Sequence, residues 1–319
     1  MPGHPPAAAS QLSKRTSAAR MRWTQFRKYK VLYFISIPGL LYFIVFKYIP
    51  LLGSAMAFQE YNIFKGFSGS PWVGLEHFQR MFEYSEFLRI LKNTILIGAY
   101  DILFAFPVPI ILAILLNEMR LVLFKRVLQT VVYMPHFLSW VIIGGIAIGI
   151  LSPSTGLVNN MIEALGLDSI YFLGEESYIR SILVGAGVWK DSGWGTIVYL
   201  AALAGINPEL YEAARIDGAN RWKQITAITV PAILPTVVIM FLLHIGNFLD
   251  FGFERVFVFL NPLNENNGDI LDTYIYRVGL IQQQYSYTTA IGLFKSVVGL
   301  GLIMLGNALS KKATGSGLY

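Results

Sequence analysis

Cysteine is absent from the 319-residue chain. A disulfide framework, a thiolate metal site and a cysteine nucleophile are therefore excluded. The four histidines lie far apart in the sequence, without H-E-x-x-H or a similar spacing, which argues against a metal site. The dipeptide Gly-Lys is also missing, so the chain has no phosphate-binding loop of the G-x-x-x-x-G-K-[ST] type. If ATP drives this protein, another chain binds the nucleotide.

Charged residues are scarce as well. They make up 14% of the chain, whereas a soluble domain carries about 25%. Hydrophobic residues reach 55% and the mean hydropathy is +0.54, which predicts an all-α integral membrane protein. The net charge of +6 does not indicate nucleic-acid binding, because the basic residues lie beside apolar runs. Orientation in a membrane explains their placement better.

Six apolar runs are long enough to cross a bilayer, for which about 20 residues are needed. Residues 1–29 are expected to form a disordered, partly amphipathic arm, and residues 312–319 a tail. The membrane domain between them covers residues 30–311. Its predicted spans are 31–57, 90–117, 122–151, 178–206, 230–248 and 288–309.

The distribution of Lys and Arg sets the expected orientation. With the N-terminus inside, the internal segments hold fifteen of the 25 basic residues, and the external segments with adjoining span ends hold seven. Both termini and the loop at residues 207–231 are therefore predicted to face the cytoplasm.

The loop at residues 207–231 is too charged to enter the bilayer. An Asp, Arg or Lys at the centre of a span costs about 2.5–3.5 kcal/mol. Six charges fall within fifteen residues here, and they sum to zero: Glu209, Glu212, Arg215, Asp217, Arg221 and Lys223. A lipid-binding loop would favour a basic surface. We therefore expect a protein partner rather than lipid headgroups.

The same loop contains signals for two short helices. Asn207 is a suitable N-cap and Pro208 suits the first helical position, while Gly218 can end the first helix in a left-handed conformation. A second helix is expected at about residues 220–228, and Pro231 is expected to restart the chain as the fifth span. The result is a helix–Gly–helix knob of a shape that suits a groove on a soluble partner.

Polar side chains inside the predicted spans form the second group of candidates. They can line a path for a solute, or they can pair with neighbouring helices and hold the bundle together. The glycines around the fourth-span charges would permit a broken helix, and aromatic rings beside them could stack on sugars. Asp101 in the second span has no evident partner. The candidates are Trp189, Lys190, Asp191 and Trp194 in the fourth span, His244, Asn247 and Asp250 on one face of the fifth, and Lys295 in the sixth.

A long spaced motif runs through the loop: E-A-A, three residues, Gly, nine residues, then I-x-L-P. It is present as Glu212-Ala213-Ala214, Gly218 and Ile228, with Val230-Pro231 where the motif prefers Leu-Pro. The chain thereby resembles the membrane subunits of binding-protein-dependent ABC importers. The resemblance implies a type I transmembrane domain of six helices, in which the knob couples to a cytoplasmic ATPase. The implied coupling residues are Glu212, Ala213, Ala214, Arg215, Asp217, Gly218, Ala219, Arg221, Ile228 and Pro231.

Residues 124–140, 271–280 and 284–300 resemble the carbohydrate branch of this family, within it the permeases for polysaccharides and complex oligosaccharides. The implied assembly contains a second, homologous permease subunit, two ATPases that bind ATP and Mg, and an external solute-binding protein, in a bacterial inner membrane. This chain would then be no enzyme and would hold no cofactor or metal. The implied substrate is an oligo- or polysaccharide, with anionic alginate as an example.

Three other classes compete with the importer, and one of them is a purely structural or receptor subunit, which the polar residues alone do not exclude. A transporter driven by an ion gradient through Asp191 or Asp101 would predict an inverted repeat, and none is evident. A membrane-embedded enzyme would need a convergent nucleophile–base or metal cluster, which the scattered histidines do not suggest.

Overall fold

The computed structural model describes residues 28–314. The arm predicted for residues 1–29 and the tail predicted for 312–319 therefore fall largely outside the described range. Within it, every regular element is helical, apart from one isolated bridge between Gln59 and Trp72. The chain divides into two compact units, Met1–Ala55 and Met56–Tyr319, which are described separately below.

The first unit contains the start of one long helical segment, Lys30–Phe58. Its apolar residues lie on all sides, as expected for a helix surrounded by lipid or by another protein. This confirms the predicted first span as a helix. Its successive parts are α2 (Lys30–Phe43), the π-helical turn η1 (Ile44–Tyr48), α3 (Ile49–Leu52) and the 3₁₀ turn η2 (Gly53–Phe58), which crosses into the second unit.

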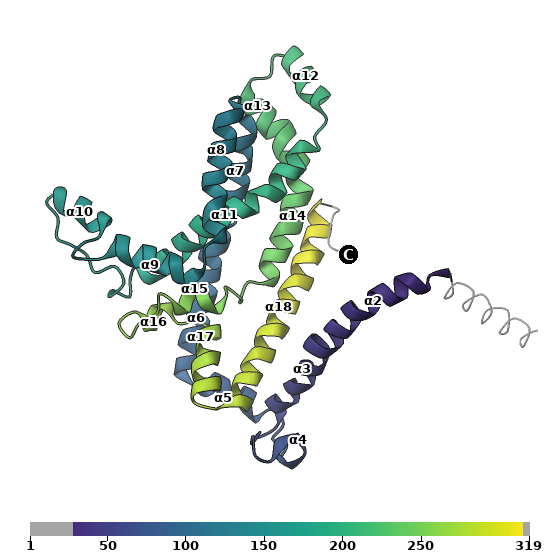
Figure 1. Cartoon of the computed structure of the whole chain (residues 1–319), viewed down its shortest axis with the longest axis vertical. Coiled ribbons are helices and arrows are strands. Elements are labelled where there is room, and N and C mark those ends of the chain that lie inside the picture. Colours follow the sequence, from purple (N-terminus) through teal and green to yellow (C-terminus); the bar gives the residue numbers. More distant parts are fainter. Residues whose placement is uncertain (1–27, 315–319) are drawn as a thin grey trace, which may run out of the picture. The chain divides into compact units, whose positions relative to one another are not determined.

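Three further long helices lie in the second unit and are also apolar enough to cross a membrane (Figure 1). The first consists of α6 (Ser85–Tyr100), the π-helical turn η3 (Asp101–Ala105) and α7 (Pro107–Glu118). The second consists of α13 (Arg221–Gln224), η5 (Ile225–Thr229) and α14 (Val230–Gly246), and the third is α18 (Tyr285–Thr314).

The sequence suggested that the chain restarts at Pro231 as the fifth span, and this prediction is wrong. The helix runs without a break from Arg221 to Gly246. A π-helical turn at Ile225–Thr229 changes the hydrogen-bonding register directly before Pro231, so the missing N–H does not interrupt the helix. The second helix of the loop is thus the beginning of the fifth span.

The segment predicted as a span at 122–151 is not one straight helix. Helix α8 (Val122–Tyr133) and the 3₁₀ turn η4 (Met134–Phe137) are followed by α9 (Trp140–Leu151), and the two parts meet at 106°. Pro135 lacks an N–H, and the Ser139 hydroxyl accepts a hydrogen bond from the Ile142 N–H and so caps the new helix.

The fourth predicted span is a single helix, α11 (Ile179–Ala204). Its glycines do not break it, contrary to the possibility raised by the sequence. They instead permit close approach, since a Cβ at Gly193 would lie 2.0 Å from the Val132 carbonyl oxygen. Among the described residues, four helices are long and apolar enough to cross a membrane, and α11, with Lys190 and Asp191 near its middle, is not one of them.

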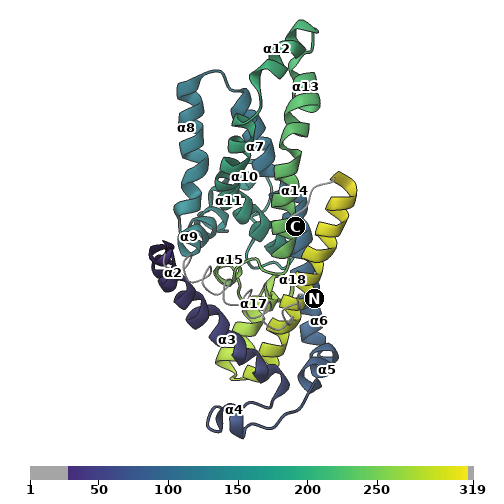
Figure 2. The ribbon, with the colours of Figure 1, turned by 90° about the vertical axis from the view of Figure 1, so that its right-hand side faces the viewer.

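Short helices complete the second unit. The helix α12 (Pro208–Ile216) lies at one end, and α5 (Glu76–Glu83) lies at the opposite end (Figures 1 and 2). The remaining elements are α4 (Gly66–Gly69), α10 (Leu157–Ala164), α15 (Phe253–Phe257), α16 (Glu265–Gly268), α17 (Leu271–Tyr274) and the π-helical turn η6 (Ile275–Ile281).

Buried apolar side chains form three clusters along this unit. One joins α5, α6, α17 and α18 through residues such as Phe87 and Leu271, and one surrounds Leu183 on α11. The third lies towards α12 and contains Tyr199 and Ile233. The second and third clusters hold α11 and α14, and the first holds α18, on which Lys295 lies.

Candidate functional site

The charged loop folds into the expected knob. The Asn207 Oδ1 accepts a hydrogen bond from the Glu209 N–H at 3.1 Å, which caps α12. At the other end Gly218 has φ +76°, and the Ala219 N–H donates to the Ala214 carbonyl at 2.8 Å. This is the closed left-handed turn that glycine favours at a helix C-terminus.

The knob is fastened to the helices that continue from it. Asn220 caps α13 by accepting from the Lys223 N–H at 2.9 Å, and the buried Gln224 donates its Nε2 to the Ala219 carbonyl at 2.8 Å. The hydroxyls of Tyr211 and Thr229 lie 2.9 Å apart and connect α12 to the start of the fifth span. A side-chain contact therefore joins α12 to that long helix in addition to the chain itself.

The outer surface of α12 is open. None of its residues is buried, and Ile216 is 86% exposed. Among residues 28–314, no ion-pair partner is found for Glu212, Arg215 or Asp217, whereas Arg221 lies 3.3 Å from Glu118 at the end of α7. Ile228 and Pro231 lie on the long helix instead of on α12. Exposed Ile216 is an addition that the sequence did not single out.

Lys190 lies against the bend of the third span. It is buried, and its Nζ donates to the carbonyl oxygens of His136 at 2.8 Å and Leu138 at 2.5 Å, the residues next to the break. The carboxylate Oδ1 of its neighbour Asp191 lies 3.0 Å from the His136 Nδ1. The His136 ring stacks on Trp194 with the centroids 4.6 Å apart. These contacts agree with the pairing interpretation of the fourth-span charges.

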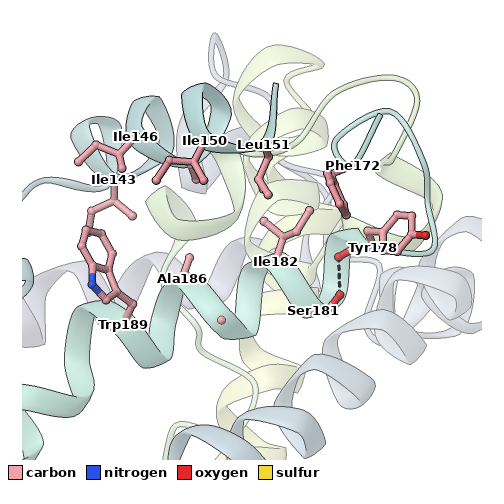
Figure 3. A pocket seen from close by; sticks show the side chains of 12 residues that line it. Ile143, Ile146, Ile150, Leu151, Phe172, Tyr178, Ser181, Ile182, Ala186 and Trp189 are labelled. Carbon is pink, nitrogen blue, oxygen red and sulfur yellow. Dashed lines mark hydrogen bonds between the residues drawn. The ribbon is translucent and has the colours of Figure 1, made fainter. Parts of the chain in front are cut away.

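Trp189 lies apart from the other polar candidates. It lines an apolar pocket of about 550 Å³ between α9 and α11, opposite Ile143 and Ile146 (Figure 3). The walls are mainly aliphatic, and Ser181 in this pocket donates its hydroxyl to the Tyr178 carbonyl. The surroundings of the Trp189 ring in this pocket are therefore mainly apolar.

Asp101 has a partner after all, and it lies 154 residues away. Arg255 of α15 donates to both carboxylate oxygens at 2.7 and 2.9 Å, and also to the Leu183 carbonyl. Asp101 is 5% exposed and Arg255 is 6% exposed. Bidentate geometry and burial make this a strong, directional pair. No sequence pattern links the two residues, because a short helix after the fifth span supplies the arginine.

Lys295 on α18 is also paired. Its Nζ contacts Asp272 of α17 and lies 3.6 Å from Asp250, which itself is exposed. Burial raises the pKa of the Asp272 carboxyl, while Lys295 acts in the opposite direction. The sequence placed Lys295 and Asp250 in the candidate group, and the fold brings them together.

His244 of α14 and Asn247, directly after this helix, line cavities inside the helix bundle. The helix ends at Gly246, so the prediction that His244, Asn247 and Asp250 share one helical face is wrong. His244 is half-buried with its ring 5.6 Å from that of Phe106. It borders two cavities of about 280 and 330 Å³, and both are also bordered by Asp101 and Arg255. Asn247 borders the larger one. Both polar and apolar side chains border these cavities.

Comparison with known proteins places these features in a family. A model of the family "Binding-protein-dependent transport system inner membrane component" matches residues 89–315. The chain is 47% identical over 290 residues to Protein LplB of Bacillus subtilis, with 91% of each chain covered. It has the same identity over the same length to the polygalacturonan/rhamnogalacturonan transport system permease protein YteP of Bacillus subtilis, covering 91% of this chain and 90% of YteP.

Solved structures agree with the sequence relatives. A chain of a bacterial alginate ABC transporter, crystallised in complex with an alginate pentasaccharide-bound periplasmic protein, matches with a TM-score of 0.86 at 40% identity. The match covers 93% of this chain and 99% of that one. The family predicted from the spaced motif is confirmed. The chain belongs to the inner membrane components of binding-protein-dependent transport systems, the permease subunits of ABC importers.

Proposed function

We propose that this chain forms one half of the translocation path of an ATP-driven importer for an oligo- or polysaccharide. The observation that carries the proposal is the knob, where most of the spaced motif lies on one exposed, fastened helix–Gly–helix unit. The relatives support the substrate class: one is named for polygalacturonan and rhamnogalacturonan, and one matched transporter imports the acidic polysaccharide alginate. An acidic polysaccharide is therefore the proposed cargo.

We propose six spans, with α11 as the fourth and the bent α8–α9 pair as the third. Lys190 and Asp191 do not prevent α11 from crossing, because both are paired with the third span. The alternation of six spans and the Lys and Arg distribution put both termini and α12 on the cytoplasmic side.

In this proposal the knob transmits force and carries out no chemistry. A cytoplasmic ATPase would hold α12 in a groove, with exposed Ile216 as an apolar anchor and Glu212 and Arg215 as polar contacts. ATP and Mg would be bound by that partner. The link from Tyr211 to Thr229 and the continuous helix from Arg221 to Gly246 would then move with α12.

The rest of the assembly follows from the same proposal. A second, homologous permease subunit would supply the other half of the path, and an external solute-binding protein would deliver the sugar. The proposed contact for the cargo consists of His244 on α14, Asn247 and Asp250 in the segment that follows this helix, and Lys295 on α18. The pairing contacts of Lys190, Asp191 and Trp194 and the apolar surroundings of Trp189 make these four residues weaker candidates for that role.

The test is ATP hydrolysis by the reconstituted importer, with both permeases, the ATPases and the binding protein in proteoliposomes. Acidic oligosaccharides presented by the binding protein should stimulate hydrolysis, and neutral oligosaccharides of equal length should not. Stimulation by neutral sugars alone would overturn the acidic cargo. Transport by the isolated chain under an ion gradient would overturn the importer itself.

A further inference from the structure

The connection from α7 into the first turn of α8 carries positive charge only. We call residues 119–126 the basic segment, and its charged residues are Arg120, Lys125 and Arg126. The sequence contains no acidic residue from position 119 to 162, and Glu118, directly before the segment, is already paired with Arg221. Within residues 28–314, none of the three basic side chains forms an ion pair. The charge of the segment is therefore uncompensated inside this chain.

The same segment exposes four large apolar side chains in succession. Leu123 is 77% exposed, and its neighbours Leu121, Val122 and Phe124 are exposed as well. From Leu123, exposed apolar side chains continue at helical spacing along α8 and η4, and they are Val127, Val131 and Met134. An apolar strip of this length on a proposed membrane span is suited to contact with lipid acyl chains.

The position of the basic segment fits the surface of a membrane. It lies at the same end of the second unit as α12, the end proposed to face the cytoplasm (Figures 1 and 2). Arg126 follows Leu123 by three residues, so both lie on the same side of α8. A long basic side chain in this place can reach a lipid headgroup while the apolar strip stays among the acyl chains.

From this combination we infer that the basic segment is a binding site for the headgroups of anionic phospholipids. Arg120 and Arg126 contact the headgroup phosphates, and Leu121 and Leu123 enter the upper part of the acyl chains. Charge complementarity selects anionic lipids, because a zwitterionic headgroup offers no net charge to balance the segment. The knob differs in this respect, since its charges sum to zero and its acidic residues would repel such headgroups.

The segment is also connected to the base of the knob. Glu118 lies 3.3 Å from Arg221, the first residue of the helix that becomes the fifth span. A lipid held by the basic segment would therefore fix the depth of both α7 and the fifth span at the cytoplasmic surface. The inference goes beyond the proposed function and takes only the orientation in the membrane from it.

Fluorescence quenching by brominated lipids tests the site on the complete importer in nanodiscs. A bimane fluorophore would be attached to this subunit at Leu123→Cys, since the chain has no native cysteine. Brominated phosphatidylglycerol, diluted into phosphatidylcholine, should quench this fluorophore more strongly than brominated phosphatidylcholine at the same mole fraction. Each of the two arginines should contribute about fivefold to the preference. High salt should lower the preference, because exposed charges are screened.

The variant Arg120→Gln/Arg126→Gln should remove the preference while both lipids still quench the fluorophore. The matched control is Lys65→Gln/Lys92→Gln, which removes two exposed charges at the opposite end of this unit and should leave the preference unchanged. A fluorophore at Val131→Cys, farther along the same apolar strip, should be quenched equally by the two lipids.

Four results would overturn the site. Equal quenching at Leu123→Cys by the two lipids would show an ordinary lipid-facing surface, and no quenching by either would show that a protein such as the ATPase covers it. A preference that persists in the double arginine variant, or one that is insensitive to salt, would show that these charges do not create it. The measurement needs neither ATP nor sugar. Failure of the proposed function would be seen separately, as a lack of sugar-stimulated ATP hydrolysis.

Discussion

The knob and the interior of the bundle treat charge in opposite ways. In the interior, Asp101 and Arg255 satisfy each other, and Lys190 is satisfied by two carbonyl oxygens. On α12, Glu212 and Arg215 are exposed, and no ion-pair partner for them is present within residues 28–314. The charges of Asp101, Arg255 and Lys190 are thus satisfied within this chain, whereas those of Glu212 and Arg215 are exposed to the surroundings.

Because of this difference, the loss of a charge should have different consequences in the two regions. A buried charge is costly unless its partner is present, so its loss should appear first as a loss of stability. An exposed charge contributes little to stability, so its loss should appear first as a loss of association. The two regions can therefore be distinguished by measuring stability and assembly in the same set of variants.

The largest effect is expected at Arg255. Replacing it by Met leaves the Asp101 carboxylate buried without a partner, which should lower the free energy of unfolding by about 3–5 kcal/mol. Thermal unfolding of the detergent-purified importer measures this loss. The matched control Arg215→Met, on the exposed face of α12, should change stability by less than about 0.5 kcal/mol. Equal losses of stability in the two variants would contradict the expected difference between the bundle interior and the knob.

The same position offers a rescue. Asp101→Leu/Arg255→Met removes both charges together and should recover most of the lost stability, because a buried pair and an apolar pair of similar volume are often comparable. A double variant that is no more stable than Arg255→Met would show that the pair does not act as a unit.

A smaller effect is expected at Lys190. Lys190→Met removes the two hydrogen bonds to the His136 and Leu138 carbonyls, where the third span bends. We expect a loss of about 1.5–3 kcal/mol, since the donor is charged and the acceptors stay behind. The control is Lys92→Met on the exposed side of α6, which should have little effect. A substrate contact would instead weaken sugar stimulation while stability stayed unchanged.

Much of the architecture could be predicted from local signals. Hydropathy located the long helices because every span must be apolar over about 20 residues. The N-cap at Asn207 and the left-handed turn at Gly218 were found because capping depends on neighbours in the sequence. The local geometry of the knob was therefore accessible to sequence reasoning.

The interior was less accessible, because its contacts join distant segments. Asp101 was recognised as unpaired, but its partner Arg255 belongs to a short helix that the hydropathy pattern assigned to an external connection. The bend between α8 and α9 was missed although two local signals, Pro135 and the capping residue Ser139, are present in the sequence. Its contacts with Lys190 come from another helix and could not be predicted. At Pro231 the sequence predicted a break that is not present. A π-helical turn directly before this proline lets the helix continue.

The smallest effect on stability, with the sharpest effect on assembly, is expected at Gly218. Its φ of +76° is unfavourable for a β-branched residue, so Gly218→Val should destabilise the turn by about 1–2 kcal/mol. The knob would be misplaced while the membrane domain stays intact. Co-purification with the ATPase should fall about 5- to 30-fold, which corresponds to the same free energy.

Gly166 provides the matched control for this substitution. It follows α10 with φ +78°, and a Cβ there, as at Gly218, has no neighbour within 4 Å. Gly166→Val therefore introduces the same backbone strain at a place remote in sequence from the knob, and ATPase co-purification should stay at the native level. If Gly218→Val also retains the ATPase in full, α12 is not the docking element. If both variants lose it, strain alone accounts for the loss and the knob has no special role.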